Sequence, residues 1–153
     1  MGARERSGAD SGGPIALDTS VIIAALLENH EHHERAFDIV RTALATGTIL
    51  PLPALLEAYA VMTRLPPPLR LPPQATMWLL RTTFEATAEL VAAARTDAWP
   101  LIDGLASSGI SGGATFDAHI VLCARLGGAS KLATFNARHF RRLDLGGIEL
   151  LEP

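Results

Sequence analysis

Short apolar runs alternate with longer segments of helical periodicity along this chain. The runs have the length of strands and no polar alternation, which is typical of strands buried on both faces of a sheet. We expect strands at 15–17, 48–50, 89–93, 131–134 and 148–151. We expect helices at 21–27, 31–45, 54–64, 74–85, 97–108 and 116–126, and a short helical turn at 137–142. This order predicts an α/β fold, a three-layer α/β/α sandwich with a central parallel sheet of four to five strands.

The chain divides into two regions by composition. Residues 1–13 contain Gly, Ser, Ala and charged residues without an apolar period, so we predict a disordered N-terminal extension. Residues 14–153 are expected to form a single domain, because a chain of 153 residues has an ordinary length for one domain.

The overall composition is that of a globular protein, with 48% hydrophobic residues and a net charge of −3. The single cysteine, Cys123, excludes an internal disulfide bond. Since no apolar run is long enough to span a bilayer and no signal-peptide pattern occurs, we expect a cytoplasmic protein without membrane association. The net charge gives no general attraction to nucleic acid, so RNA binding would depend on local basic patches.

Asp18 lies between two apolar runs, at 15–17 and 21–23. Burying an unpaired carboxylate costs several kcal/mol, so a metal ion or a polar partner must offset that cost. The hydroxyl residues Thr19 and Ser20 follow directly, and one of them is expected to cap the next helix. We therefore interpret Asp18 as the first ligand of a metal site.

Two further acids, Glu57 and Asp117, lie in almost wholly apolar helical segments. Either one alone could occupy the exposed face of its helix. Because sites in parallel α/β sheets gather beyond the carboxyl ends of the strands, we expect both to converge on Asp18, with Asn136 after the fourth strand. Converging carboxylates repel each other unless a cation lies among them. An all-oxygen cluster suits Mg²⁺ or Mn²⁺, and such an ion is typical of phosphoryl chemistry.

Four motifs, in this order, make the chain resemble the PIN-domain ribonucleases, and among them the toxins of VapBC-type toxin–antitoxin pairs. The motifs are Leu17–Ser20, Leu56–Tyr59, Thr115–Ile120 and Leu132–Phe140. The resemblance implies an α/β/α sandwich and metal-dependent cleavage of RNA phosphodiester bonds, with tRNA, rRNA or mRNA as substrate.

The resemblance also implies roles for individual residues. Asp18 and Asp117 would bind the metal directly, and Glu57 would complete the acidic cluster directly or through water. Asn136 stands where many members carry an acid; it lacks that charge but can still bind water or metal through its carbonyl oxygen. The number of metal ions is therefore open. Ser20 or Thr19 would orient the Asp18 carboxylate by a hydrogen bond.

The resemblance further implies a cognate antitoxin, with an arginine that pairs with the carboxylates, and a homodimer. The Pro-rich segment at 66–73, with the helix containing residues 77–80, is a candidate dimer surface; packing inside the monomer is the alternative. Arg138 and Arg141 are candidate RNA contacts within a basic segment near Asn136, although a solvated helix end would also explain them.

Two other functional classes fit parts of the pattern. A haloacid-dehalogenase-type phosphatase also begins with an acid after the first strand, but it needs a second Asp where this chain has Ser20. A catalytically silent PIN-like module that binds RNA or protein remains the alternative to a nuclease.

Overall fold

The computed structural model describes residues 12–153. The predicted disorder of residues 1–13 therefore falls mostly outside the described residues, and Gly12 and Gly13 belong to no helix or strand.

Within residues 12–153, five strands form one sheet in the order β3-β2-β1-β4-β5. Every neighbouring pair is parallel, which confirms the predicted parallel sheet. The strands are β1 (Ile15–Leu17), β2 (Thr48–Pro51), β3 (Ala88–Val91), β4 (Lys131–Ala133) and β5 (Glu149–Leu151). The first strand, β1, is the central one and lies between β2 and β4. Its carboxyl end is therefore at the middle of the edge where the strands end.

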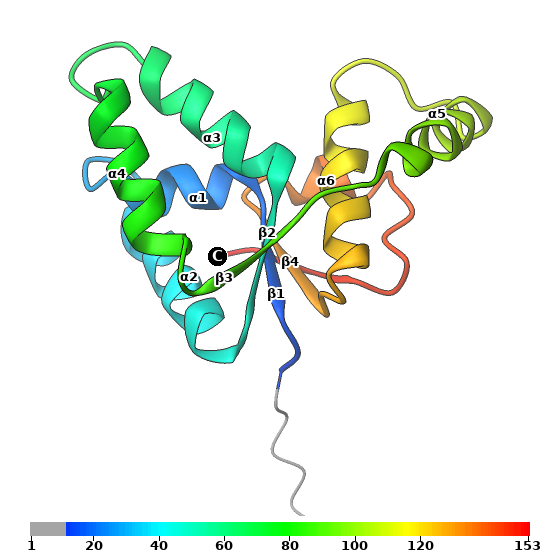
Figure 1. Cartoon of the computed structure of the whole chain (residues 1–153), viewed down its shortest axis with the longest axis horizontal. Coiled ribbons are helices and arrows are strands. Elements are labelled where there is room, and N and C mark those ends of the chain that lie inside the picture. Colours follow the sequence, from blue (N-terminus) through cyan, green and yellow to red (C-terminus); the bar gives the residue numbers. More distant parts are fainter. Residues whose placement is uncertain (1–11) are drawn as a thin grey trace, which may run out of the picture.

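Helices cover both faces of the sheet, which confirms the three-layer prediction (Figure 1). Figure 1 shows α1, α2 and α4 on one side of the sheet, α5 and α6 on the other, and α3 across the edge where the strands end. The helices are α1 (Thr19–Leu26), α2 (His33–Thr46), α3 (Leu52–Arg64), α4 (Pro73–Phe84), η1 (Arg95–Asp97), α5 (Ala98–Ser107), α6 (Ala114–Leu126) and α7 (Ala137–Phe140). Each lies within a few residues of its predicted bounds.

The core is built from the apolar faces of these helices and the central strands. All three residues of β1 are buried, and Leu132 and Phe140 are fully buried beside them. The expectation of strands buried on both faces is wrong for β3, where Glu89 and Leu90 are exposed, and for β5, where Glu149 is exposed. Both are edge strands of the sheet, and each lacks a neighbouring strand on one side.

The start of α1 also differs from the prediction. Asp18, and neither Thr19 nor Ser20, occupies the N-cap position, and its side chain makes no capping hydrogen bond. The backbone N–H of Asp18 donates instead to the carbonyl of Ala133 at 3.0 Å, which fixes Asp18 against the end of β4. The hydroxyl groups of Thr19 and Ser20 are thereby free to face the edge of the sheet.

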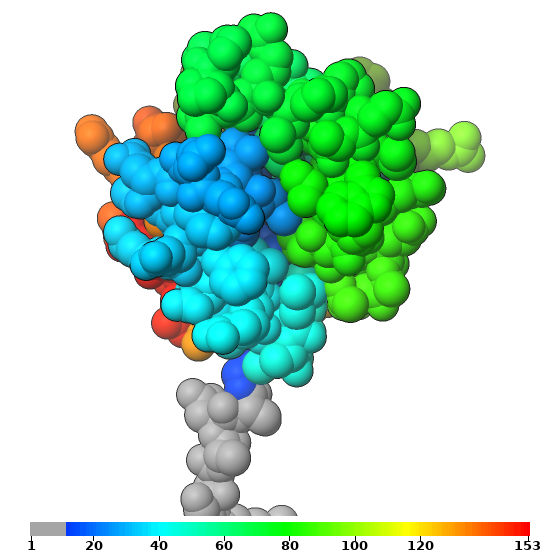
Figure 2. Space-filling model, turned by 90° about the vertical axis from the view of Figure 1, so that its left-hand side faces the viewer, coloured from blue at the N-terminus to red at the C-terminus, as the bar shows by residue number. Residues whose placement is uncertain are grey.

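Figure 2 shows the face formed by α1 and α2, in blue and cyan, beside the green segment of α4 and β3. None of the helices within residues 12–153 is long and apolar enough to cross a membrane.

The C-terminal end of α6 lies against the sheet without room for a side chain at Gly127. A Cβ atom there would lie 2.7 Å from Ile49 Cγ2 and 3.1 Å from Val91 Cγ2. We therefore expect Gly127→Ala to lower the free energy of unfolding in urea by about 1–3 kcal/mol, the usual cost of overpacking. Gly104→Ala in α5 is the matched control, because nothing lies within 4 Å of its added Cβ. It should be neutral or stabilise by up to about 1 kcal/mol. Equal effects of the two substitutions would contradict this close packing.

Candidate active site

Asp18 is the most enclosed acid of the sheet edge, with 3% of its surface exposed. Its Oδ2 atom accepts hydrogen bonds from the hydroxyl groups of Ser20 and Thr134, each at 2.7 Å. Burial raises the pKa of the Asp18 carboxyl above its ordinary value, while hydrogen bonds from Thr134 and Ser20 act in the opposite direction. The carboxylate is therefore held in one orientation by local donors, but its desolvation is only partly offset.

The two hydroxyl groups are themselves oriented by the backbone. The N–H of Phe135 donates to Ser20 Oγ at 3.1 Å, and the N–H of Asn136 donates to Thr134 Oγ1 at 2.9 Å. Because each hydroxyl oxygen accepts from a backbone N–H, its own proton points toward Asp18. The loop after β4 thus fixes the Asp18 carboxylate through two parallel relays.

Glu57 approaches the same place from α3. Its Oε2 atom accepts a hydrogen bond from Thr19 Oγ1 at 2.9 Å, across 38 positions of the sequence. Glu57 is exposed, so its carboxylate lies at the open side of the site while Asp18 lies at its floor. Thr19 and Ser20 therefore bond to different acids, Thr19 to Glu57 and Ser20 to Asp18, and their supporting role in a site stays a prediction.

Asp117, on α6, lies near enough to both of these acids for their charges to act on it. Burial raises the pKa of the Asp117 carboxyl, and the negative charges of Asp18 and Glu57 raise it further. His139 and Arg142 lower it in part. Asp117 is therefore close enough to Asp18 and Glu57 to be repelled by both, and the role of the three acids as one metal site stays a prediction.

The donor set suits a hard divalent cation. All three acids offer oxygen ligands, and their mutual repulsion is the kind that Mg²⁺ or Mn²⁺ relieves. Within residues 12–153, however, no three His, Cys, Asp or Glu side chains are placed to enclose an ion by themselves. This geometry fits an ion that is held by one or two carboxylates and retains water ligands, as Mg²⁺ usually does.

Asn136 is the N-cap residue of α7 and is exposed. Its backbone N–H belongs to the Thr134 relay, but no hydrogen bond joins its side chain to another residue of the 12–153 segment. Its predicted role as a ligand of metal or water stays a prediction.

The basic residues that act on Asp117 differ from the two candidate RNA contacts, Arg138 and Arg141, whose role stays a prediction. Arg138 is exposed, and Arg141 Nη2 lies 3.3 Å from Glu152 Oε1 on the surface. The basic side chains that lower the pKa of the Asp117 carboxyl are His139 and Arg142. The sequence does not single them out, because Arg142 lies in the turn after α7 and its direction depends on the folded chain.

Sequence reasoning also missed Thr134, which is completely buried and bonded to Asp18. The signal for it lies in the sheet register. Leu17 pairs with Ala133, so the residues that follow the two strands must be neighbours. This neighbour relation becomes visible only once β1 and β4 are known to be adjacent.

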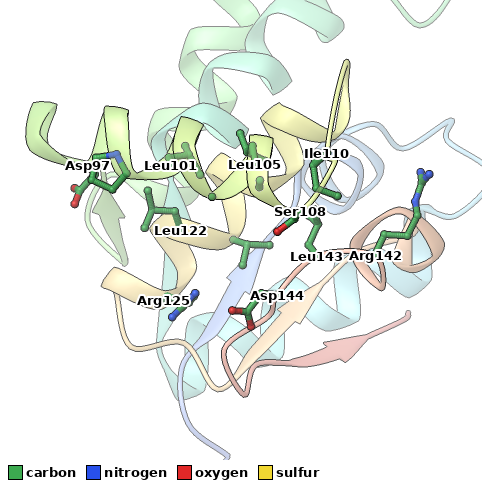
Figure 3. Close-up of a pocket in the computed structure, with 14 residues that line it drawn as sticks. Asp97, Leu101, Leu105, Ser108, Ile110, Leu122, Arg125, Arg142, Leu143 and Asp144 are labelled. Atoms are coloured by element: carbon green, nitrogen blue, oxygen red, sulfur yellow. The ribbon is translucent and has the colours of Figure 1, made fainter.

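One pocket of the described chain lies away from the carboxylates. It has a volume of about 350 Å³ and lies between α5, α6 and the segment after α7. Figure 3 shows Arg125 and Arg142 at opposite ends of this pocket, with Leu101, Leu105 and Leu122 along it. Arg142 thus borders both the apolar pocket and the acidic site.

The sequence model of the PIN domain matches residues 15–145 of this chain. This stretch contains all three carboxylates and the loop after β4. The chain therefore belongs to the PIN-domain family.

Two relatives place the chain among the VapC ribonucleases of that family. Ribonuclease VapC40 of Mycobacterium tuberculosis is 42% identical over 125 residues, covering 81% of this chain and 87% of the relative. Ribonuclease VapC27 of the same organism is 39% identical over 127 residues, covering 82% and 86%.

Solved structures share the fold. VapC20 of Mycobacterium tuberculosis, a Sarcin-Ricin loop cleaving toxin, matches with a TM-score of 0.67 at 13% identity over 83% of this chain and 93% of its own. VapBC2 of Rickettsia felis, bound to a DNA fragment from its promoter, matches with a TM-score of 0.65 at 16% identity over 91% and 98%. At these identities the likeness supports the PIN-like architecture.

The repulsion at Asp117 has a consequence for stability. A pKa that is higher in the folded than in the unfolded state means that the folded protein binds more protons, so stability is lost as the pH rises through that window. We expect Asp117→Asn to unfold at a higher urea concentration than the parent at pH 7 in EDTA. This gain should shrink as the pH falls toward about 4, where carboxyl groups become protonated in both states.

Asp103→Asn on the exposed face of α5 is the control for that comparison, because a solvated carboxylate has no burial to relieve. A loss of stability in Asp117→Asn at pH 7, or a gain that does not change with pH, would contradict the repulsion described here.

Proposed function

We propose that this protein is the toxin of a VapBC-type pair, a divalent-metal-dependent endoribonuclease that cleaves RNA phosphodiester bonds in the cytoplasm. The observation that carries the proposal is the convergence of Asp18, Glu57 and Asp117 at the carboxyl edge of a PIN-domain sheet. The identity with named VapC ribonucleases, 42% and 39%, supports the same reaction class.

Asp18 and Asp117 are the residues that would hold the ion, with Mg²⁺ the first candidate and Mn²⁺ the second. A bound divalent ion supplies charge stabilisation for the phosphodiester and a lowered pKa for a coordinated water. The hydrogen bonds from Ser20 and Thr134 would hold the Asp18 carboxylate in one orientation, whether or not an ion is bound. Thr19 holds Glu57 at the open side, where this acid completes the cluster directly or through water.

Cations at the rim would receive the RNA backbone. His139 and Arg142 already act on Asp117, so they are placed for the phosphate group nearest the acids. Arg138 and Arg141 lie on the surface of the same segment and are candidates for more distant phosphates. Asn136, at the start of α7, would bind water or metal through its amide oxygen.

The proposal includes a cognate antitoxin as partner. Solved relatives include a VapBC from Salmonella typhimurium bound to DNA, which is a complex of that family. An antitoxin arginine entering the site would be favoured by the carboxylate repulsion, because a guanidinium can pair with carboxylates in place of the metal.

A homodimer is also proposed, and α4 offers a surface for it. Met77 and Trp78 are 40% and 62% exposed, whereas Leu80 of the same helix is buried in the monomer. The helix therefore packs inward and still leaves an apolar outer face. The catalytically silent PIN-like module is the alternative function, and no contact of the site favours it.

Substitution of the proposed ligands tests the reaction. We expect Asp18→Asn and Asp117→Asn each to lower the rate of Mg²⁺- or Mn²⁺-dependent RNA cleavage by at least about a hundred-fold, because each removes charge at the reacting phosphate. Induced expression of the parent should arrest growth, and expression of either variant should not. RNA fragments mapped by sequencing identify the bond that is cut.

Asp103→Asn is again the matched control, since it removes an exposed acid on α5 and should leave cleavage unchanged. A parent that cuts no RNA, or Asn variants that cut as fast as the parent, would leave the silent binding module as the better description.

A further inference from the structure

A stack of rings lies beside the acidic site. The ring of His32, the residue before α2, lies on the ring of Phe135 with centroids 4.8 Å apart and planes tilted by 19°. The ring of His30 lies 5.8 Å from that of His32, and the guanidinium of Arg35 lies 5.9 Å from the Phe135 centroid. We call these four residues the His32–Phe135 platform.

The platform is joined to the acidic site through the backbone. Phe135 follows Thr134, the buried donor to Asp18, and its own N–H donates to Ser20 Oγ. In Figure 2 the blue-to-cyan surface of α1 and α2 borders the orange surface of the α7 region.

The platform is open to solvent on one side. The side chain of His32 is 36% exposed, Phe135 is half-buried, and Arg35 is exposed. The only ionic contact of the His32 ring within residues 12–153 is Glu31, 3.5 Å away and 81% exposed. The His32 ring stacks on Phe135 and is still partly exposed. Its exposed surface is therefore available to a further stacking partner.

We infer that the His32–Phe135 platform binds an unpaired nucleobase of the RNA, next to the phosphate that reaches the carboxylates. This inference rests on the proposed ribonuclease function. Bases splayed out of single-stranded RNA stack on aromatic side chains and on arginine planes, and such stacking tolerates different bases. The platform offers two stacked rings with the Arg35 guanidinium beside them, so it fits the flat face of a base.

Binding to two RNA-like probes separates stacking from charge. The probes are a fluorescent single-stranded 12-mer of adenosine and a 12-mer of the same ribose-phosphate backbone without bases, and both are tested with Mg²⁺. The protein is the full chain carrying Asp18→Asn, which prevents cleavage. We expect His32→Ala to weaken binding of the adenosine 12-mer by about ten-fold, and of the abasic 12-mer by less than about two-fold.

Two further variants complete the test. His32→Phe keeps a ring and should bind the adenosine 12-mer within about two-fold of the parent. His33→Gln is the control from the same segment, because His33 contacts the carbonyl of Ala24 and does not touch Phe135. It should leave binding of both probes unchanged. The unfolding temperature of each variant is measured as well, and a value equal to that of the parent shows that the fold is intact.

Three results would overturn the platform: equal losses on both probes, no loss on either, or His32→Phe as weak as His32→Ala. The test is independent of cleavage. If the chain with Asp18 intact cuts no RNA but the base-dependent loss is found, the nuclease proposal fails and the platform stands. If that chain cuts RNA and the loss is absent, the reverse holds.

Discussion

The structure depends on one costly feature, a carboxylate buried where β1 ends and α1 begins. Asp18 is 3% exposed, and its charge is opposed by desolvation. The fold offsets part of this cost with hydroxyl groups from Ser20 and Thr134, each pinned by a backbone N–H. Thr134 follows β4 and Asp18 follows β1, so their hydrogen bond requires these two strands to be neighbours. The strand order of the sheet is therefore a condition for the site.

The carboxylates of this site repel one another. Such like-charge repulsion is expected of a site that binds a cation, whereas a structural ion pair joins opposite charges. Asp117 is raised in pKa by burial and by its acidic neighbours, and only His139 and Arg142 oppose the effect. The repulsion between the carboxylates therefore lowers the stability of the folded protein, and it makes this edge of the sheet attractive to cations. Under the proposed function, a divalent ion and an antitoxin arginine would each relieve this repulsion, so they would compete for the same place.

Much of this was readable in the sequence, for identifiable reasons. Unbroken apolar runs marked the parallel strands, and Asp18, Glu57 and Asp117 stood out as acids in apolar surroundings. Thr134 did not stand out, because its role depends on a hydrogen bond to Asp18, which is 116 positions away in the sequence. The effect of Arg142 rather than Arg141 on Asp117 was likewise unreadable, because both residues lie in the turn after α7 and the sequence does not show which way that turn directs them.

The central claim is that these carboxylates share a divalent ion, and calorimetric titration with Mn²⁺ tests it most directly. The account predicts saturable binding to the metal-free parent, accompanied by a rise in unfolding temperature, because an ion that binds only the folded state stabilises it. Asp18→Asn should lose both effects, and Asp103→Asn should keep them. Equal Mn²⁺ binding by the parent and Asp18→Asn, or no binding by the parent, would contradict the claim.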